Sequence, residues 1–230
     1  MAVAAPECRD TAHAGRAFTI CTLNAAQDDI RLFHKSDGQV LGSFNRLDTA
    51  LADQGLALTF AMNAGMYHDD RRPVGLYVEE GEETARLIPN PGPGNFGLLP
   101  NGVFCLTEGR AAVIETLAFR DNPPACRFAS QSGPMLVIDG ALHPKFLPDS
   151  TSRHFRNGVG VEADGQTVHF AISDERVTFW EFATLFRDVL NTPNALYFDG
   201  NVSRLFAPAI GRNDTGFAMG PMVGAVAPRQ

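Results

Sequence analysis

A short apolar run that ends at a carboxylate is the feature of this sequence that most clearly suggests chemistry. Residues 194–198 are followed at once by Asp199 and Gly200, and Ser203 and Arg204 come shortly after. A strand that stops at a carboxylate beside a glycine turn holds a reactive group on a rigid element and leaves its tip open. Because Asp-Gly is also common turn chemistry, a plain turn aspartate is the alternative interpretation.

Other apolar runs also end in polar residues, and this recurrence predicts a cleft lined by strand ends. Asn63 ends one such run and is followed by Gly65, where the backbone could approach a ligand closely. Asp139 and Asp174 end two further runs, although Asp139-Gly140 favours a hairpin turn. Active sites collect residues from several strand ends, so an enzyme is the favoured class of protein.

Composition limits the partners that the protein can have. The chain has 230 residues, of which 44% are hydrophobic and 20% charged, which is enough for a sizeable core. Its net charge of −7 argues against non-specific binding to nucleic acid, which needs a basic face. No apolar run approaches the length of a membrane span. His68, Asp69 and Asp70 could ligate a metal, but solvated charge is the simpler interpretation, and we expect no metal or cofactor.

The four cysteines favour disulfides over a zinc or redox site, because no two of them form a C-x-x-C arrangement. Three pairings are possible, and we favour Cys8–Cys21 with Cys105–Cys126. The first bridge would tie residues 1–17, interpreted as an N-terminal tail, to the first strand. Four buried free thiols in a cytoplasmic protein are the alternative.

The start of the sequence bears on localisation. Small residues dominate Met1–Pro6 and could be the remnant of a signal-peptide cleavage region. Together with the expected disulfides, this pattern favours a periplasmic or secreted protein.

Turn residues divide the chain into short strands, and helices are expected at only two places. Ser43 is a candidate N-cap for a first helix that stops at Gly55. Thr178 and Glu181 form a capping box for a second helix, which ends before Pro193. The expected strands are residues 18–23, 30–34, 56–62, 74–78, 102–106, 112–116, 135–138, 158–161, 167–172 and 195–198.

Strands and helices do not alternate along the chain, which disfavours a doubly wound fold. We therefore predict an α+β fold, in which a mainly antiparallel or mixed β-sheet core is covered by few helices. Residues 18–230 are expected to form a single catalytic domain. The segment Pro89–Gly97, rich in proline and glycine, is expected to be a surface loop near the cleft.

Six segments, taken in order, resemble the phosphodiester glycosidase family. They are residues 61–67, 73–81, 95–104, 131–140, 152–161 and the segment that begins at Asp199. This is the family of the lysosomal uncovering enzyme, which removes N-acetylglucosamine from a sugar–phosphate diester, and of many secreted bacterial proteins. The resemblance runs from Thr19 to Gly224 and implies an α+β hydrolase acting on a glycosyl phosphodiester. The sequence departs from the family pattern in having one glycine after Asp199 rather than several.

The implied reaction sets the groups that the site needs. Cleavage of a sugar–phosphate bond expels a phosphate monoester, so a strong general acid is less necessary than in ordinary glycoside hydrolysis. A carboxylate must activate water or attack the sugar carbon, and a cation must hold the phosphate. Asp199 is the first candidate for the carboxylate and Asp174 the second. Arg156 matches the family's arginine and is the candidate for the phosphate, which guanidinium groups bind bidentately.

Polar groups at the other strand ends are candidates for binding the sugar hydroxyls or the phosphate oxygens. These candidates are Asn63, Gly65, Gln131, Ser132, Asn157 and Ser203. The expected partner is a small-molecule or glycan phosphodiester. The alternative is a non-catalytic envelope module that binds an anionic glycan or a glycosyl phosphate with the same polar strand ends.

Overall fold

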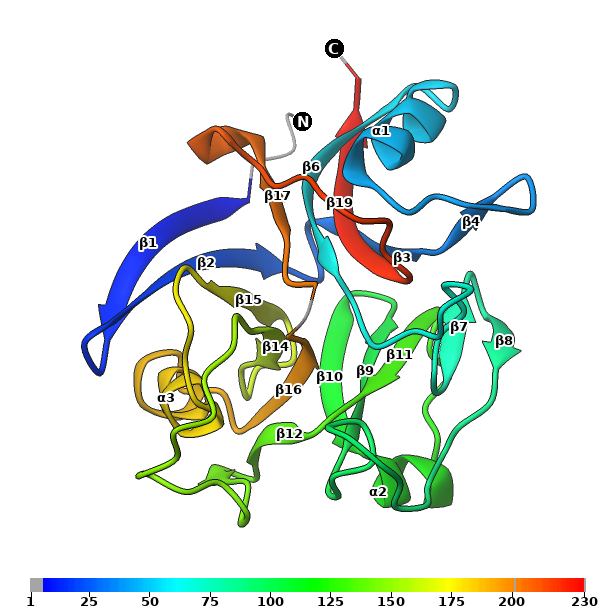
Figure 1. The fold of residues 1–230 in the computed structure, drawn as a ribbon. Helices are drawn as coiled ribbons and strands as arrows, with labels where there is room; N and C mark the ends of the chain where they lie inside the picture. Colours follow the sequence, from blue (N-terminus) through cyan, green and yellow to red (C-terminus); the bar gives the residue numbers. More distant parts are fainter. Residues whose placement is uncertain (1–5, 201, 230) are drawn as a thin grey trace.

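The computed structural model describes residues 6–200 and 202–229, and most of its elements are β-strands. Within these residues, neighbouring strands of the three main sheets pair antiparallel. Few helices accompany them (Figure 1). The predicted α+β fold with a mainly antiparallel core is therefore confirmed.

The largest sheet has seven strands in the order β1-β2-β15-β14-β16-β12-β13. Their bounds are β1 (Glu7–His13), β2 (Arg16–Asn24), β12 (Met135–Ile138), β13 (Ala141–Leu142), β14 (Asn157–Val161), β15 (Thr167–Ser173) and β16 (Asn194–Asp199). Strands β14 and β16 are neighbours near its centre, so the candidates Asn157 and Asp199 lie on adjacent strands.

Two further sheets have five strands each. One has the order β10-β9-β11-β7-β8, with β7 (Tyr77–Glu79), β8 (Glu82–Ala85), β9 (Gly102–Thr107), β10 (Arg110–Glu115) and β11 (Phe128–Ser132). The other has the order β18-β17-β6-β19-β3, with β3 (Asp29–Phe33), β6 (Leu56–Asn63), β17 (Leu205–Ala207), β18 (Arg212–Asn213) and β19 (Met222–Pro228). A small hairpin joins β4 (Lys35–Ser36) to β5 (Gln39–Val40).

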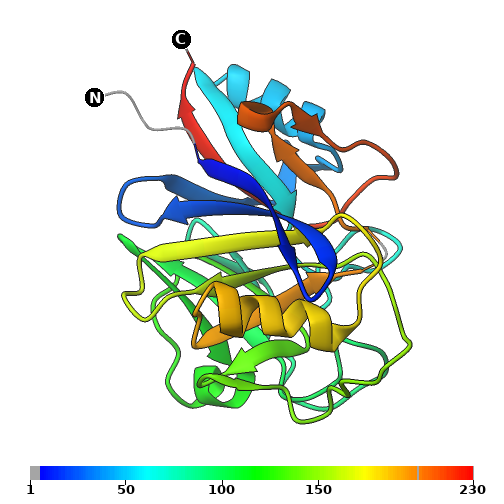
Figure 2. The ribbon, with the colours of Figure 1, turned by 90° about the vertical axis from the view of Figure 1, so that its left-hand side faces the viewer.

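Each sheet turns one face to a shared central core and the other face to a helix. In β16, Leu196 and Phe198 enter the central core, whereas Ala195 and Tyr197 pack towards the helix. This alternation follows from the two-residue repeat of a strand. Figure 2 shows the helix of the seven-stranded sheet, α3 (Phe179–Thr184), across the lower half of the molecule. Since both faces of the sheets are covered, the ends of the strands are left for ligands.

The helices begin where the sequence predicts. Ser43 caps α1 (Phe44–Ala52), which packs on the sheet of β6 and β19. Thr178 and Glu181 form the expected capping box of α3, which continues as a π-helical turn, η1 (Leu185–Val189). Two short helical elements were not predicted, α2 (Thr116–Asp121) and the 3₁₀ turn η2 (Pro208–Ile210).

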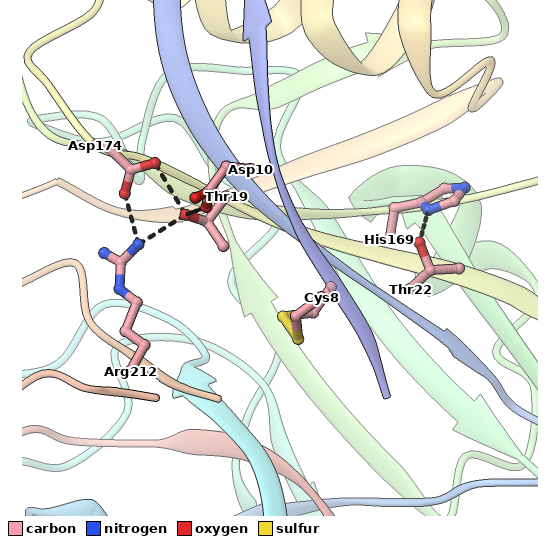
Figure 3. Close-up of a disulfide and its surroundings, with 8 residues drawn as sticks. Cys8, Asp10, Thr19, Thr22, His169, Asp174 and Arg212 are labelled. Carbon is pink, nitrogen blue, oxygen red and sulfur yellow. Dashed lines mark hydrogen bonds and ion pairs between the residues drawn. A yellow bond between two sulfur atoms is a disulfide. The ribbon is translucent and has the colours of Figure 1, made fainter. Parts of the chain in front are cut away.

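The N-terminal region differs from the expected tail. Residues 7–13 form β1, which pairs with β2 along its whole length, while residues 1–5 of the interpreted cleavage region lie outside the described residues. Cys8 lies directly opposite Cys21 in this ribbon and forms a disulfide with it (Figure 3). The second expected pair, Cys105–Cys126, is also a disulfide. No helix among the described residues is long and apolar enough to cross a membrane.

Both disulfides should be measurable in the purified protein. Thiol titration after denaturation without reductant should detect no free thiol, because the structure pairs all the cysteines. Closed loops with sequence separations of 13 and 21 residues should stabilise the fold by about 3 kcal/mol each, so reductant should lower the free energy of unfolding in urea. The control is the same titration after reduction, and detection of four thiols without reductant would contradict both bridges.

Candidate active site

Two buried asparagines join two sheets at the ends of their strands. Asn63 ends β6 and Asn157 begins β14, and neither side chain is exposed. The Asn63 Nδ2 donates to Asn157 Oδ1 at 3.2 Å, and the Asn157 Nδ2 donates to Asn63 Oδ1 at 3.0 Å and to the Asn63 carbonyl at 2.9 Å. The two amides therefore satisfy each other in a place without access to water.

The same two amides hold the chain on either side of the candidate carboxylate. The Asp199 main-chain N–H donates to Asn157 Oδ1 at 3.1 Å, and the Arg204 main-chain N–H donates to Asn63 Oδ1 at 3.0 Å. The Ser203 hydroxyl donates to the Asp199 carbonyl at 2.9 Å. Strands β6, β14, β16 and β17 consequently come together near the middle of the molecule in Figure 1. Asp199, Asn63, Asn157 and Ser203 thus form one connected group.

The negative charge of Asp199 raises the pKa of two tyrosines. Burial raises the pKa of Tyr67, and the negative charge of Asp199 raises it further, whereas Arg71 and Arg204 oppose the shift. Burial also raises the pKa of Tyr197, an effect opposed by Arg156 and increased by Asp199. Both hydroxyls are therefore protonated at neutral pH and can donate hydrogen bonds. The Asp199 carboxylate itself accepts the Gly200 N–H at 2.6 Å.

Arg156 directly precedes β14, and its side chain packs against Phe179 and Tyr197 rather than on the Asn63–Asn157 pair. Its side chain is 1% exposed, and its Cζ lies 3.5 Å from the centroid of the Phe179 ring. The guanidinium donates to the Val177 carbonyl at 3.1 Å, and the buried Nη1 has no partner among the described residues. Burial lowers the pKa of Arg156, and Tyr197 opposes this shift. In this position the guanidinium does not open to solvent, and its contact with phosphate stays a prediction.

Asp174 belongs to a separate cluster, in which it directly follows β15 and meets Arg212 of β18. One carboxylate oxygen pairs with Arg212 Nη1 at 2.5 Å, and the other lies 2.9 Å from the Thr19 hydroxyl (Figure 3). Arg212 also pairs with Asp214, whose carboxylate accepts the Leu205 N–H. The Asp174 charge is thus balanced by a neighbour, and within residues 6–200 and 202–229 no hydrogen bond joins Asp174 to the asparagine pair.

The two candidates on β11, Gln131 and Ser132, form hydrogen bonds with other parts of the protein. The Gln131 side chain accepts the N–H groups of Leu76 and Ile88 and donates to the Ile88 carbonyl. The neighbouring Ser132 points to the other face and donates to the Phe198 carbonyl at 2.9 Å. Gln131 therefore lies away from the group around Asp199, whereas Ser132 fixes the strand that carries it.

The backbone at Gly65 lies close to another part of the protein, the Ser130 side chain, rather than to an open space that could hold a ligand. Its φ is +149°, and an added Cβ would lie 2.9 Å from the Ser130 hydroxyl. The Pro89–Gly97 segment does reach the site: Asn95 lies near enough to the Tyr197 hydroxyl to lower its pKa, and Phe96 is buried. A surface hollow of about 840 Å³ is lined by residues 25–30, 80–81, 106–109 and 125–128, and none of these belongs to the site.

Sequence reasoning missed the two tyrosines. Tyr197 stands within an apolar run, where a tyrosine is typical of a core position. Tyr67 lies in the loop that follows the strand ending at Asn63. The position of Tyr197 two residues before Asp199 was a usable signal, because residues i and i+2 of a strand share a face.

Loss of the asparagine pair should destabilise the whole fold. Asn157→Ala removes the partner of the Asn63 amide and of the Asp199 N–H, and buried groups left without partners should lower the free energy of unfolding by about 2–4 kcal/mol. Urea denaturation measures this change. Asn213→Ala is the matched control, because exposed Asn213 makes only a 3.4 Å contact with Asn45. Equal stability of the two variants would contradict the role of the pair.

Comparison with known proteins places the site within a recognised family. A family model described as phosphodiester glycosidase matches residues 57–218, a range that holds Asn63, Asn157, Asp199 and Arg204. In sequence, the uncharacterized protein YigE of Escherichia coli (strain K12) is 33% identical over 208 residues, which are 89% of this chain and 80% of that protein.

Two solved structures share the fold. A hypothetical protein from Synechocystis has a TM-score of 0.62 at 14% identity, and the match covers 96% of this chain but only 62% of that one. The catalytic domain of zebrafish N-acetylglucosamine-1-phosphodiester alpha-N-acetylglucosaminidase, auto-inhibited by its pro-peptide, has a TM-score of 0.66 at 13% identity, covering 96% of this chain and 81% of that domain. The family model, which matches more than half of the chain, shows that this protein belongs to the phosphodiester glycosidase family.

Proposed function

We propose that this protein hydrolyses a glycosyl phosphodiester at the bond between the sugar and the phosphate. The observation that carries the proposal is the placement of Asp199 at the end of β16, anchored through its main chain to the Asn63–Asn157 pair and flanked by Tyr67 and Tyr197. Membership of the phosphodiester glycosidase family supports this substrate class.

Asp199 supplies the reactive carboxylate in this proposal. Its main-chain N–H and carbonyl are both held, by Asn157 and by Ser203, so the carboxylate is positioned before the substrate arrives. It activates water or attacks the anomeric carbon as positive charge develops on the sugar. The phosphate monoester leaves without a strong general acid, and the two tyrosine hydroxyls can donate hydrogen bonds to substrate oxygens.

Asp174 and Arg156 have less direct parts. Asp174 is the second choice for the carboxylate, because its pairing with Arg212 already balances its charge. Arg156 is proposed to act through Tyr197, because its buried guanidinium carbon lies 5.5 Å from the centroid of the Tyr197 ring and opposes the rise in the pKa of Tyr197. Four other candidates for substrate binding are proposed to position the site instead, since their side chains bind the protein's own main chain. They are Asn63, Asn157, Ser132 and Ser203.

The site of action is proposed to be the periplasm or the exterior of the cell. Two disulfides support this location, because they form and persist in oxidising compartments.

The test of the reaction is the release of free sugar from synthetic sugar-1-phosphodiesters by the purified protein. Asp199→Asn keeps the shape of the side chain but removes its charge, so kcat should fall by at least about 100-fold. Asp139→Asn is the matched control, because Asp139 directly follows β12, precedes a glycine and is not part of the site; its kcat should be unchanged.

Thermal melts establish that both variants are folded. Near-normal turnover by folded Asp199→Asn would remove Asp199 from the chemistry. Binding of the diester by calorimetry without any turnover by the wild type would instead favour the non-catalytic module.

Variants of Arg156, with a variant of nearby Arg153 as the control, test whether Arg156 acts through Tyr197. Arg156→Ala removes a buried cation that supports Tyr197, so kcat should fall about tenfold with little change in KM, and Arg156→Lys should recover part of the loss. Arg153→Ala, which breaks only a partly exposed pair with Glu181, should leave both constants near their normal values. A large rise in KM for Arg156→Ala would instead show that Arg156 contacts the phosphate.

A further inference from the structure

Arg71 is held in an unusual main-chain conformation beside Tyr67. Its φ is +70°, in the left-handed region that residues other than glycine seldom adopt. The Arg71 N–H donates to the His68 carbonyl at 2.7 Å, and His34 Nε2 lies 2.8 Å from the Arg71 carbonyl. The Arg71 Cζ then lies 5.2 Å from the centroid of the Tyr67 ring. Strain of this kind persists only where the surroundings hold it, and it is concentrated at functional sites.

The adjacent arginine shows that this placement is specific. Arg72 donates its N–H to Asp70 at 3.1 Å and pairs with the same carboxylate through its guanidinium, with both side chains exposed. Arg71 forms no ion pair with a carboxylate in residues 6–200 or 202–229. Of two consecutive arginines, one pairs with a carboxylate, whereas the other donates from Nη1 to the Asp69 carbonyl at 3.2 Å and lies against the Tyr67 ring.

Tyr67 is fixed between this arginine and the chain that precedes β19. Its hydroxyl lies 3.5 Å from the Ala218 carbonyl, and an added Cβ at Gly220 would come within 2.5–2.7 Å of the tyrosine side chain. A side chain at position 220 would therefore displace the ring. The chain segment that accepts from the Tyr67 hydroxyl also accepts from Arg204, at the Phe217 carbonyl, and the negative charge of Asp199 raises the pKa of Tyr67.

Arg204 places a second cation next to Tyr67. Its side chain is 8% exposed, and its Nη1 donates to the Phe217 carbonyl. The nearby Asp214 is paired with Arg212, and Arg204 forms no ion pair within the described part of the chain. A buried cation that lacks a bonded carboxylate is costly, so an anion bound nearby would lower the free energy of this arrangement.

From this placement we infer that Arg71, Tyr67 and Arg204 form the subsite that binds the phosphate group of the substrate. Arg71 is the direct ligand, since its fork can make two parallel hydrogen bonds to phosphate oxygens. The Tyr67 hydroxyl donates a further hydrogen bond to the phosphate, and the Arg204 guanidinium adds a positive charge next to Tyr67. A phosphate bound there lies beside Asp199, which leaves the sugar carbon facing the carboxylate. The inference rests on the proposed function for the identity of the substrate, but phosphate binding itself requires no turnover.

Calorimetry with inorganic phosphate at low ionic strength tests the subsite directly. Arg71→Gly removes the guanidinium and tolerates the left-handed conformation, so the fold should be retained, as a thermal melt can check. Its dissociation constant for phosphate should rise about tenfold, and Arg71→Lys should lie between it and the wild type. Arg72→Gly is the matched control and should change the constant by less than about twofold. Equal binding by wild type and Arg71→Gly, or no binding of phosphate by the wild type, would overturn the subsite.

Kinetics with a sugar-1-phosphodiester separate this inference from the proposed reaction. For an active enzyme, Arg71→Gly should raise KM about tenfold, whereas Arg72→Gly should not. If no diester is turned over but phosphate binding depends on Arg71, the subsite stands and the hydrolase assignment fails. If diesters are turned over with a KM that is independent of Arg71, the hydrolase assignment stands and the subsite fails.

Discussion

The reciprocal hydrogen bonds between Asn63 and Asn157 are the interaction on which the arrangement of the site depends. The two side chains come from different sheets, and each amide oxygen also accepts a main-chain N–H next to the site, from Arg204 or from Asp199. Unpaired, these buried groups would cost several kcal/mol in total. The sheets can therefore meet only in a register that satisfies them, and that register also sets the position of Asp199.

The fold explains why the polar residues gather at this junction. Each sheet buries one face in the common core and the other beneath a helix, as Leu196 and Tyr197 on β16 illustrate. A polar side chain in the middle of such a strand would have to be buried on either face. Strand ends are the places where a carboxylate such as Asp199 keeps a rigid support and an open tip. The cross-strand bridge between Cys8 and Cys21 fastens the outer edge of the same sheet and leaves the junction unaffected.

The sequence predicted those parts of the fold that have a local signal. The alternation in residues 167–172 and the capping box at Thr178 depend on neighbouring residues, so they could be identified without tertiary information. Strand β1 has no such signal, because an edge strand of alternating polar residues is stabilised by its partner and by the Cys8 bridge. Strand β11 was missed for a different reason: Ser130 and Ser132 are polar but buried, and their hydroxyls donate to the main-chain carbonyls of Ala64 and Phe198.

The same distinction separates the site residues that sequence could find from those it could not. Asn63, Asn157 and Asp199 end or begin apolar runs, and each was identified. Arg156 was identified with Asn157, and adjacent residues of an extended chain point to opposite faces. Asn157 holds the Asp199 main chain, whereas the Arg156 guanidinium packs against Phe179 and Tyr197. Because Arg156 is buried, a more exposed cation for the group around Asp199 comes from another position. A loop residue such as Arg71 can provide it, because it lies outside the strands of the sheets and its guanidinium reaches the Tyr67 ring.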